Sequence, residues 1–406
     1  MTHTCRFCAA PLVHTFCDLG TTPPSNSYLK STEQKESFFP LHAYVCDGCL
    51  LVQLGQFQTP DEIFGDYAYF SSFSESWIEH GRQYAKMICE RFGFDQTHFV
   101  VEIASNDGYL LQHFQSKGIP LLGIEPAKNV AQCALEKGIP TLVQFFGKKT
   151  ASALAKEGKT ADLIIGNNVL AHVPDLNDFV GGLKLLLKPE GVITLEFPHL
   201  LQLVAHNQFD TIYHEHFSYF SLMVAEKIFL HHGLELFDVE ELPTHGGSLR
   251  VYLQHRHQKH PISKRVGALK KQEQEKGYAR LETYTSYSLQ VKKYKERLLS
   301  FLEMLKREKK TIAGYGAPAK GNTLLNYCAI TRDLLPFTVD KSPHKQGRFL
   351  PGTHIPIYAP EKIQEYRPDY LLILPWNLKT EIMHQMALIK DWSGKFVIPI
   401  PEIEVF

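Results

Sequence analysis

The chain has 406 residues, and at roughly 150 residues per domain this length favours two or three domains. Its 43 basic and 43 acidic side chains balance without a basic stripe, which argues against nucleic acid as a partner. The apolar runs all fall short of the roughly 18 residues of a membrane span, so we expect no membrane partner. The eight cysteines and the polar N-terminus indicate a cytoplasmic protein rather than a secreted disulfide scaffold.

Two Cys-x-x-Cys pairs near the N-terminus form the first pattern, Cys5 with Cys8 and Cys46 with Cys49. Two thiolates at this spacing can face one tetrahedral ion, and the second pair completes four ligands, as in a zinc ribbon with a long connection. Because four protein ligands leave no open coordination position, we expect a structural Zn²⁺ in a module over residues 1–60. The alternative is four reduced cysteines without a metal.

Residues 60–76 are rich in hydroxyl and aromatic side chains and precede a helix predicted over 77–92. This segment is either a packed connector or one wall of an active-site cleft. The candidates for the cleft are Tyr67, Tyr69, Ser71 and Ser72.

A buried-strand signal over 99–103 runs into a small polar loop, and a helix is predicted over 109–115. The loop has a single glycine, Gly108, so the dinucleotide-binding fingerprint is not met. Glu102 in the strand and the Asp-Gly pair after it look like motif I of S-adenosylmethionine-dependent methyltransferases. Glu125 ends the next strand, where a carboxylate holds the ribose hydroxyls of the cofactor in such folds. The alternative is an ordinary strand–turn–helix unit.

Further strands are predicted over 141–143, 162–166 and 191–197, the last of them after a turn. Two final strands, over 234–241 and 248–255, are joined by a link short enough for an antiparallel hairpin. Five parallel strands that end in such a hairpin make the seven-stranded methyltransferase sheet, so we expect this domain over residues 61–256.

The strand over 162–166 opens into a polar loop that resembles the fourth-strand motif of the same class, with His172 in it. In that class the loop flanks the cofactor. The cofactor-binding candidates from all these segments are Glu102, Ala104, Ser105, Asn106, Gly108, Glu125, Pro126, Asn167 and Asn168.

A Tyr-His-Glu-His segment, Tyr213 to His216, lies between the fifth strand and the hairpin. Ligands of open α/β sheets bind beyond the carboxyl ends of the strands, so this segment is placed to cover the methyl group of the cofactor. The spacing does not match H-E-x-x-H, so we expect no zinc here. Histidine titrates near neutral pH and a neighbouring carboxylate can orient it, which favours acid–base chemistry. The alternative is a solvated aromatic loop.

The C-terminal part, residues 257–406, begins with a long amphipathic helix, broken near Gly277, and continues as a second α/β unit. Its first strand runs into a glycine-rich turn and a helix start at Lys320. Backbone N–H groups at such a helix start hold phosphate, and Lys320 adds charge, although the P-loop motif is not met. We expect a diphosphate site here; the alternative is a Rossmann-like domain without a ligand. Further strands are predicted over 336–340, 370–375 and 395–399.

These segments resemble, in order and over nearly the whole chain, the S-adenosylmethionine-dependent sugar C-methyltransferases of deoxysugar biosynthesis. The resemblance implies an N-terminal zinc-binding module, a central seven-stranded Rossmann-like methyltransferase domain and a smaller C-terminal Rossmann-like α/β domain. It implies as substrate a nucleoside-diphosphate-linked 4-keto-6-deoxy sugar, with thymidine as the family's usual nucleoside, methylated at C-3. The blocks that carry it are the four cysteines and residues 67–72, 102–108, 167–173, 213–219, 245–250 and 314–323.

The resemblance also assigns the active site. Methylation of carbon needs a carbon nucleophile, and a C–H group beside a ketone supplies one when a base removes the proton. We expect His216 to be that base, with Glu215 and Tyr213 orienting it or binding the sugar. Tyr67 or His172 is expected to stabilise the oxyanion or to position the substrate. The substrate-binding candidates, besides the three residues Tyr69, Ser71 and Ser72, are His245, Arg250, Tyr315, Lys320, Asn322, His344, Lys345 and Arg348.

Other readings remain open at this stage. The same fold could methylate oxygen or nitrogen of a small molecule, and the chain could be a non-catalytic zinc-ribbon binding protein. An NAD-dependent oxidoreductase is disfavoured because a third glycine and an acidic ribose partner are not clear in the C-terminal turn. Since the three parts of one chain supply a complete cleft, we expect a monomer.

Overall fold

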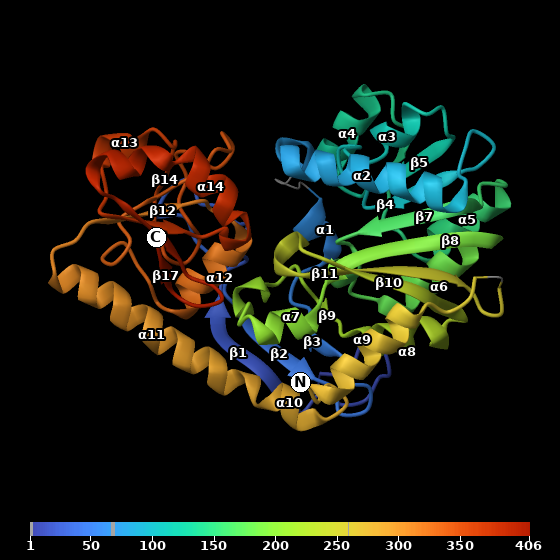
Figure 1. Cartoon of the computed structure of the whole chain (residues 1–406), viewed down its shortest axis with the longest axis horizontal. Helices are drawn as coiled ribbons and strands as arrows, with labels where there is room; N and C mark the ends of the chain where they lie inside the picture. Colours follow the sequence, from blue (N-terminus) through green and yellow to red (C-terminus); the bar gives the residue numbers. More distant parts are fainter. Residues whose placement is uncertain (1–2, 66–69, 259) are drawn as a thin grey trace.

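A computed structural model describes residues 3–65, 70–258 and 260–406 of the chain. The described residues form three sheets, of four, seven and six strands. Figure 1 shows the seven-stranded and six-stranded sheets in two lobes, with the small N-terminal sheet at the base between them. The predicted α/β class with three parts is confirmed, while the predicted boundaries at residues 60 and 256 stay a prediction.

The N-terminal sheet is antiparallel, in the order β1-β2-β3-β9. Its first three strands belong to the cysteine module, but β9 comes from the Tyr-His-Glu-His region, and Tyr219 of β9 pairs with Val52 of β3. The sequence did not predict this pairing, which ties the module directly to the central domain. The strands are β1 (His14–Thr22), β2 (Phe39–Val45), β3 (Val52–Leu54) and β9 (Ser218–Tyr219).

The central sheet has the order β10-β11-β8-β7-β4-β5-β6, and only β11 runs antiparallel to its neighbours. This is the predicted arrangement, with the hairpin β10–β11 at one edge. The predicted turn over 188–191 is wrong, because β8 already begins at Leu187 and a register shift against β7 absorbs the irregularity. The strands are β4 (Val100–Ile103), β5 (Leu121–Ile124), β6 (Thr141–Leu142), β7 (Ala161–Asn167), β8 (Leu187–Pro198), β10 (Leu234–Leu242) and β11 (Ser248–His255).

Helices cover both faces of the central sheet with separate apolar clusters. On one face α2 packs against the sheet through buried residues such as Tyr84 and Ile88. On the other face α6, α8 and the start of the C-terminal part pack through residues such as Phe179 and Phe229. The helices of this region are α1 (Pro60–Phe64), α2 (Glu75–Phe92), α3 (Gln112–Gln115), α4 (Lys128–Glu136), α5 (Lys148–Lys156), α6 (Leu176–Leu186), α7 (Leu200–Ala205) and α8 (Leu222–His231).

The predicted connector is three helices, α9 (Lys264–Glu275), α10 (Leu281–Thr285) and α11 (Tyr287–Arg307). The break falls near Gly277, as predicted, where φ is +86° and a side chain would crowd Thr283. The predicted buried stripe of α11 is confirmed and lies in one core with the strands of the N-terminal sheet and the C-terminal domain. In Figure 1 this helix runs along the base of the C-terminal lobe and past β1.

The C-terminal sheet has the order β14-β13-β12-β15-β16-β17, parallel except for β17. The strand order reverses between β12 and β15, and ligands of such sheets bind beyond the carboxyl ends at this point. Only β14 and β17, of two residues each, were not predicted. The elements are β12 (Ile312–Tyr315), β13 (Thr338–Val339), β14 (Ile357–Tyr358), β15 (Tyr370–Ile373), β16 (Lys395–Ile398), β17 (Glu404–Val405), α12 (Ala319–Tyr327), α13 (Lys362–Tyr366) and α14 (Lys379–Gln385).

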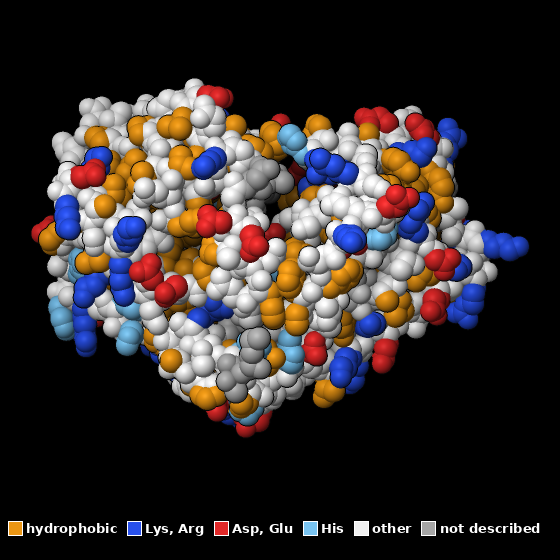
Figure 2. All heavy atoms as spheres, turned by 180° about the vertical axis from the view of Figure 1, so that it is seen from behind, with side chains coloured by type: hydrophobic (Ala, Val, Ile, Leu, Met, Phe, Trp, Pro, Cys, Tyr) orange, Lys and Arg blue, Asp and Glu red, His pale blue; other side chains and the backbone are white. Residues whose placement is uncertain are grey.

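The surface agrees with the balanced composition. On the face seen in Figure 2, basic and acidic side chains are interspersed and the molecule is hollowed between the lobes. Each helix of the described chain is too short or too polar to span a bilayer.

Leu298→Ala should lower the free energy of unfolding by about 2–5 kcal/mol, because this fully buried residue of α11 lies in the core that the three parts share. Leu289→Ala on the same helix is the control, since Leu289 is 63% exposed and its truncation should cost less than about 0.5 kcal/mol. Denaturant unfolding followed by circular dichroism measures both. Equal losses for the two variants would show that this face of α11 does not hold the parts together.

Candidate active site

The four predicted zinc ligands form one cluster. The Sγ atoms of Cys5, Cys8, Cys46 and Cys49 all lie within 4.8 Å of one another. Both knuckles fold alike: the residue after each pair has positive φ, at Ala9 and Leu50, and its N–H donates back to the first cysteine of the pair. Four thiolates at such separations suit tetrahedral Zn²⁺, and they leave no position for a substrate.

The backbone of the loop after β4 donates a hydrogen bond to a buried carboxylate, that of Glu125. The two oxygens of Glu125 accept the backbone N–H groups of Asn106, at 3.0 Å, and Ala127, at 2.9 Å. Gly108 has φ +77°, and a Cβ there would lie 2.3 Å from Ile139, so the motif needs glycine at this position. Burial, followed by the charges of Glu125 and Asp107, raises the pKa of Glu102 well above its usual value.

Several buried polar atoms at the carboxyl ends of β4 and β7 have no hydrogen-bond partner among the described residues. Such atoms cost free energy when they are left unpaired, so they indicate a polar ligand. These atoms suit a group rich in hydroxyl and amine functions. Ala104, with φ +56°, follows β4, and half-buried Pro126 follows β5. The unpaired atoms are Glu102 Oε2, Ser105 Oγ, Asp107 Oδ1, both amide atoms of Asn167, and Asn168 Oδ1.

His216 is held as a neutral imidazole with a free-base nitrogen. Its Nδ1–H donates to the carbonyl of Thr211 at 2.9 Å, so Nε2 is the acceptor and receives the hydroxyl of Tyr213 at 2.9 Å. Burial, and then the neighbouring His172, holds the pKa of His216 well below its usual range. His216 as a whole is half-buried.

His172 lies beside His216. The two ring centroids are 4.7 Å apart, and His172 Nδ1 donates to the backbone carbonyl of Glu215 at 2.8 Å. Burial lowers the pKa of His172 to about 4, so it is neutral at neutral pH and its Nε2 is left for another contact. The backbone N–H of Phe217 donates to the carbonyl of Ala171 at 2.7 Å, which fixes this segment to the loop after β7.

The carboxylate of Glu215 is bound by a residue that the sequence analysis missed. Asn26, in the loop between β1 and β2, donates its side-chain amide to Glu215 Oε1 at 2.5 Å. Burial raises the pKa of Glu215 to about 7. Asn26 belongs to no motif, so the sequence carried no signal for this contact.

Lys320 lies at the strand-order reversal of the C-terminal sheet. Its Nζ donates to the amide oxygen of Asn377 at 2.7 Å and lies 4.5 Å from the ring centroid of Trp376. Burial lowers the pKa of Lys320 to about 8, although the charge of Asp210 opposes this shift. Trp376 in turn donates to Asp210 at 2.7 Å, and Gly246 of the β10–β11 turn packs against its ring. The C-terminal domain thus meets the central domain next to the histidines.

His245 and Asn322 also lie at this junction. Asn168 donates to His245 Nε2 at 3.3 Å, and burial lowers the pKa of His245 to about 4. The amide of Asn322 donates to the carbonyl of Ser25 in the N-terminal module at 2.5 Å. The structure therefore brings parts of all three sheets to one place.

The remaining predicted residues are more scattered. Lys345 donates to the carbonyl of Ala317 at 3.0 Å, and half-exposed Arg348 follows on the same loop. The ring of His344 stacks 6.3 Å from that of Phe70. Tyr315 donates to Gln385 inside a separate pocket of about 510 Å³ in the C-terminal domain.

Ser71 and Ser72 border the motif I loop. The backbone N–H of Ser71 donates to Asn106 Oδ1 at 2.8 Å, and the Ser72 hydroxyl accepts from Lys137 at 3.0 Å. Both serines thus lie beside the motif I loop. Tyr67 and Tyr69 lie outside the described residues.

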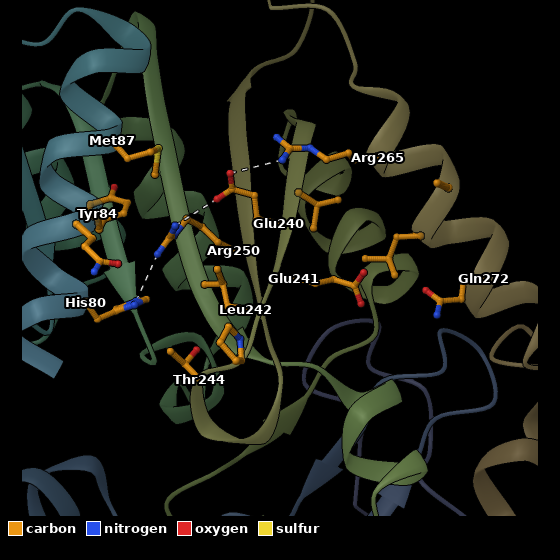
Figure 3. A pocket seen from close by; sticks show the side chains of 15 residues that line it. His80, Tyr84, Met87, Glu240, Glu241, Leu242, Thr244, Arg250, Arg265 and Gln272 are labelled. Carbon is orange, nitrogen blue, oxygen red and sulfur yellow. Dashed lines mark hydrogen bonds and ion pairs between the residues drawn. The ribbon is translucent and has the colours of Figure 1, made fainter. Parts of the chain in front are cut away.

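Arg250 lies in a pocket of about 870 Å³ between α2, the hairpin β10–β11 and α9 (Figure 3). Its guanidinium pairs with Glu196 and Glu240, each at 3.2 Å, and Glu240 also faces Arg265 at 3.5 Å. The carboxylates already bind this cation. It connects to the histidine region through Glu196, which accepts from Thr244 at 2.9 Å, and through His80, whose Nε2 lies 3.3 Å from the guanidinium. Its role in substrate binding stays a prediction.

A seven-stranded sheet of this order, with unpaired polar atoms at its carboxyl edge, defines an S-adenosylmethionine-dependent methyltransferase, and residues 77–239 match a family model described as "Methyltransferase domain". Residues 5–64 match "Putative zinc binding domain", and residues 243–401 match "C-methyltransferase C-terminal domain". The chain is 35% identical over 403 residues to C-methyltransferase NovU from Streptomyces niveus, covering 99% of this chain and 96% of that protein. The chain therefore belongs to the C-methyltransferase family.

Two other comparisons each cover less than half of the chain. The chain is 28% identical over 95 residues to a ubiquinone biosynthesis O-methyltransferase from Bartonella tribocorum, covering 23% of this chain and 38% of that protein. A solved S-adenosylmethionine-dependent methyltransferase from Clostridium acetobutylicum matches with a TM-score of 0.35 and 11% identity, covering 44% of this chain and 92% of that one. That score is too low to support an argument. The expected cofactors, S-adenosylmethionine and Zn²⁺, follow from the family models and the cysteine cluster.

Proposed function

We propose that this C-methyltransferase methylates C-3 of a nucleoside-diphosphate-linked 4-keto-6-deoxy sugar, with His216 as the base that forms the enolate. The observation that carries the proposal is the state of His216: a half-buried residue with a neutral imidazole whose Nε2 lone pair is fixed by the bond from Nδ1 to Thr211. Such a base is ready to accept a proton at neutral pH. We infer further that the enzyme acts as a cytoplasmic monomer, because one chain supplies residues from all three parts of the site.

The chain's own groups account for each proton. His216 Nε2 takes the proton from C-3, and the C–H electron pair becomes the enolate, with negative charge on the oxygen at C-4. The Tyr213 hydroxyl, which binds Nε2 in the free enzyme, turns to donate to that oxygen. When bound, S-adenosylmethionine would supply the methyl group: the enolate carbon would form the new C–C bond as the S–CH3 bond breaks, with its electron pair left on sulfur. The ketone would then re-form, and His216 would release its proton to solvent. His172 is proposed to position the sugar beside the base, because its Nδ1 binds the carbonyl of Glu215 and its Nε2 is left for the substrate.

The other groups divide between cofactor and sugar nucleotide. Glu125 and the asparagines after β7 are proposed to hold the cofactor, because their polar atoms lie at the carboxyl edge. Ionised Glu215 is proposed to accept a hydrogen bond from a sugar hydroxyl. Lys320 and Lys345 are proposed to bind the diphosphate, since both lie near the strand-order reversal of the C-terminal sheet.

The test is an incubation of purified protein with labelled S-adenosylmethionine and a dTDP-4-keto-6-deoxyhexose in deuterated water, read by mass spectrometry. Transfer of one methyl group to C-3, or deuterium at C-3 when no methyl donor is added, supports the proposal. Methyl transfer to oxygen or nitrogen of the substrate, with no exchange at carbon, would overturn it.

Glu125→Gln should weaken S-adenosylmethionine binding about 10- to 100-fold, because it removes the charge from an acceptor proposed to bind the ribose hydroxyls. Isothermal titration calorimetry measures the change directly. Glu136→Gln, an exposed change on α4, is the matched control and should leave the affinity unaltered. An unchanged affinity in Glu125→Gln would remove this residue from the proposed cofactor site.

A further inference from the structure

The loop between β1 and β2 joins the proposed active-site carboxylate to the C-terminal domain. Asn26 donates to Glu215 at 2.5 Å, the carbonyl of Ser25 accepts from Asn322 at 2.5 Å, and the hydroxyl of Tyr28 donates to the carbonyl of Ala317 at 2.5 Å. Ser25 and Tyr28 are 4% and 7% exposed. Three contacts from the first part of this loop, where Ser25 and Tyr28 are buried, therefore hold the two larger domains around Glu215.

The orientation of the Asn26 amide follows from the acceptor that it faces. An ionised carboxylate has no hydrogen to donate, so the amide nitrogen faces Glu215, while Asn26 Oδ1 lies 3.3 Å from the hydroxyl of Tyr28, whose proton goes to Ala317. An N–H group directed at a carboxylate favours the ionised form of that carboxylate. Burial raises the pKa of Glu215, and the hydrogen bond from Asn26 acts in the opposite direction and lowers it.

We propose that Asn26 is a positioning residue, through which the zinc-binding module fixes the carboxylate of Glu215 in the active site. The inference rests on the proposed function, in which the carboxylate of Glu215 accepts a hydrogen bond from a hydroxyl of the sugar. A neutral amide suits this task, because it supplies one donor without adding a positive charge that would oppose protonation of His216. The module then contributes to the geometry of the site as well as to the fold.

The groups that face Glu215 limit what else could control its protonation. Tyr28 lies on the module side, His172 binds the Glu215 backbone from the loop after β7, and His216 is next in the chain. Lys345, from the C-terminal loop, lies 5.4 Å from the ring centroid of Tyr28. Asn26 is the group whose side chain binds the Glu215 carboxylate within the described chain.

The test compares Asn26→Ala and Asn26→Asp with the wild type. Removal of the donor should move the acidic limb of the pH profile of kcat/KM upward by about one pH unit, so that the rate on that limb falls about tenfold. Asn26→Asp keeps the shape of the side chain, which protects folding, and adds a like charge, so its limb should move at least as far. Gln34→Ala is the matched control, because it removes an exposed amide from the same loop.

An infrared titration of the free enzyme gives a readout that does not depend on activity. The carboxyl stretching band of Glu215 is the one that Glu215→Gln removes, and its midpoint should rise in both Asn26 variants. A wild-type midpoint and acidic limb in both variants, with an active wild type, would overturn the role of Asn26. A wild type that neither methylates nor exchanges carbon would instead overturn the proposed function, and the infrared midpoint would still decide whether Asn26 holds Glu215.

Discussion

His216→Asn is expected to lower methyl transfer on the order of 10²- to 10⁴-fold, and to abolish deuterium exchange at C-3, while cofactor binding is retained. Asparagine is close to imidazole in size and can still donate to the carbonyl of Thr211, but it has no basic lone pair to take a proton. The Tyr213 hydroxyl would then lose the acceptor that it binds at 2.9 Å. Exchange is the sharper measurement, since it reports removal of the proton without the methyl donor.

The control for His216→Asn is His206→Asn, which changes an exposed histidine at the end of α7 in the same insertion. It should leave both methyl transfer and exchange unaltered. If His216→Asn kept wild-type exchange, another group would be the base. Half-buried His172 would be the first to test, because its Nδ1 binds the carbonyl of Glu215 and its Nε2 is left for another contact.

The pH at which these rates are compared follows from the neighbouring groups. Because the pKa of His216 is held well below its usual value, His216 stays unprotonated through the neutral range and does not set the acidic limb. Glu215, with its pKa raised to about 7, is protonated as the pH falls through neutrality. The ionised carboxylate, which is proposed to accept a hydrogen bond from the sugar hydroxyl, is then lost. Lys320, with its pKa lowered to about 8, loses its charge on the alkaline side. Activity is therefore expected to be highest between these two values.

Patterns of local origin were predicted well from the sequence. The period of α11, the order of the central sheet and the cysteine cluster each depend on residues close together in the chain, or on a repeated pairing rule. The Tyr213–His216 contact has the same origin, because it spans three residues. The resemblance to the sugar C-methyltransferases, rather than local spacing alone, assigned both residues to one site.

Contacts between the three parts could not be predicted in this way. The pairing of β3 with β9 and the bond from Asn26 to Glu215 join segments more than 160 residues apart. Neither has a motif, and each depends on how the domains pack. The same reason explains Lys320: the glycine-rich turn predicted its helix start, but Trp376 and Asp210, which set its environment, lie in other segments.

Cys46→Ser is expected to release zinc and to unfold the N-terminal module. Zinc binding to a four-cysteine site contributes about 10–16 kcal/mol in isolated zinc fingers, far more than the small β1–β3 sheet can supply from its own core. We expect loss of bound zinc in a colorimetric assay, a lower melting temperature and rapid proteolysis between β1 and β3. Cys133→Ser, a half-buried thiol on α4 outside the cluster, is the matched control and should keep its zinc.

The loss of zinc should also lower the activity, although the ion is not expected to take part in the reaction. Unfolding of the module removes β3, to which β9 is paired just after His216, and it removes Asn26 from Glu215. Methyl transfer should therefore fall with the zinc content while S-adenosylmethionine still binds to the central domain, whose motif I loop and Glu125 lie outside the module. A zinc-free variant with full methyl transfer would show that the module is dispensable, and it would leave the base to be held by Thr211 and the loop after β7 alone.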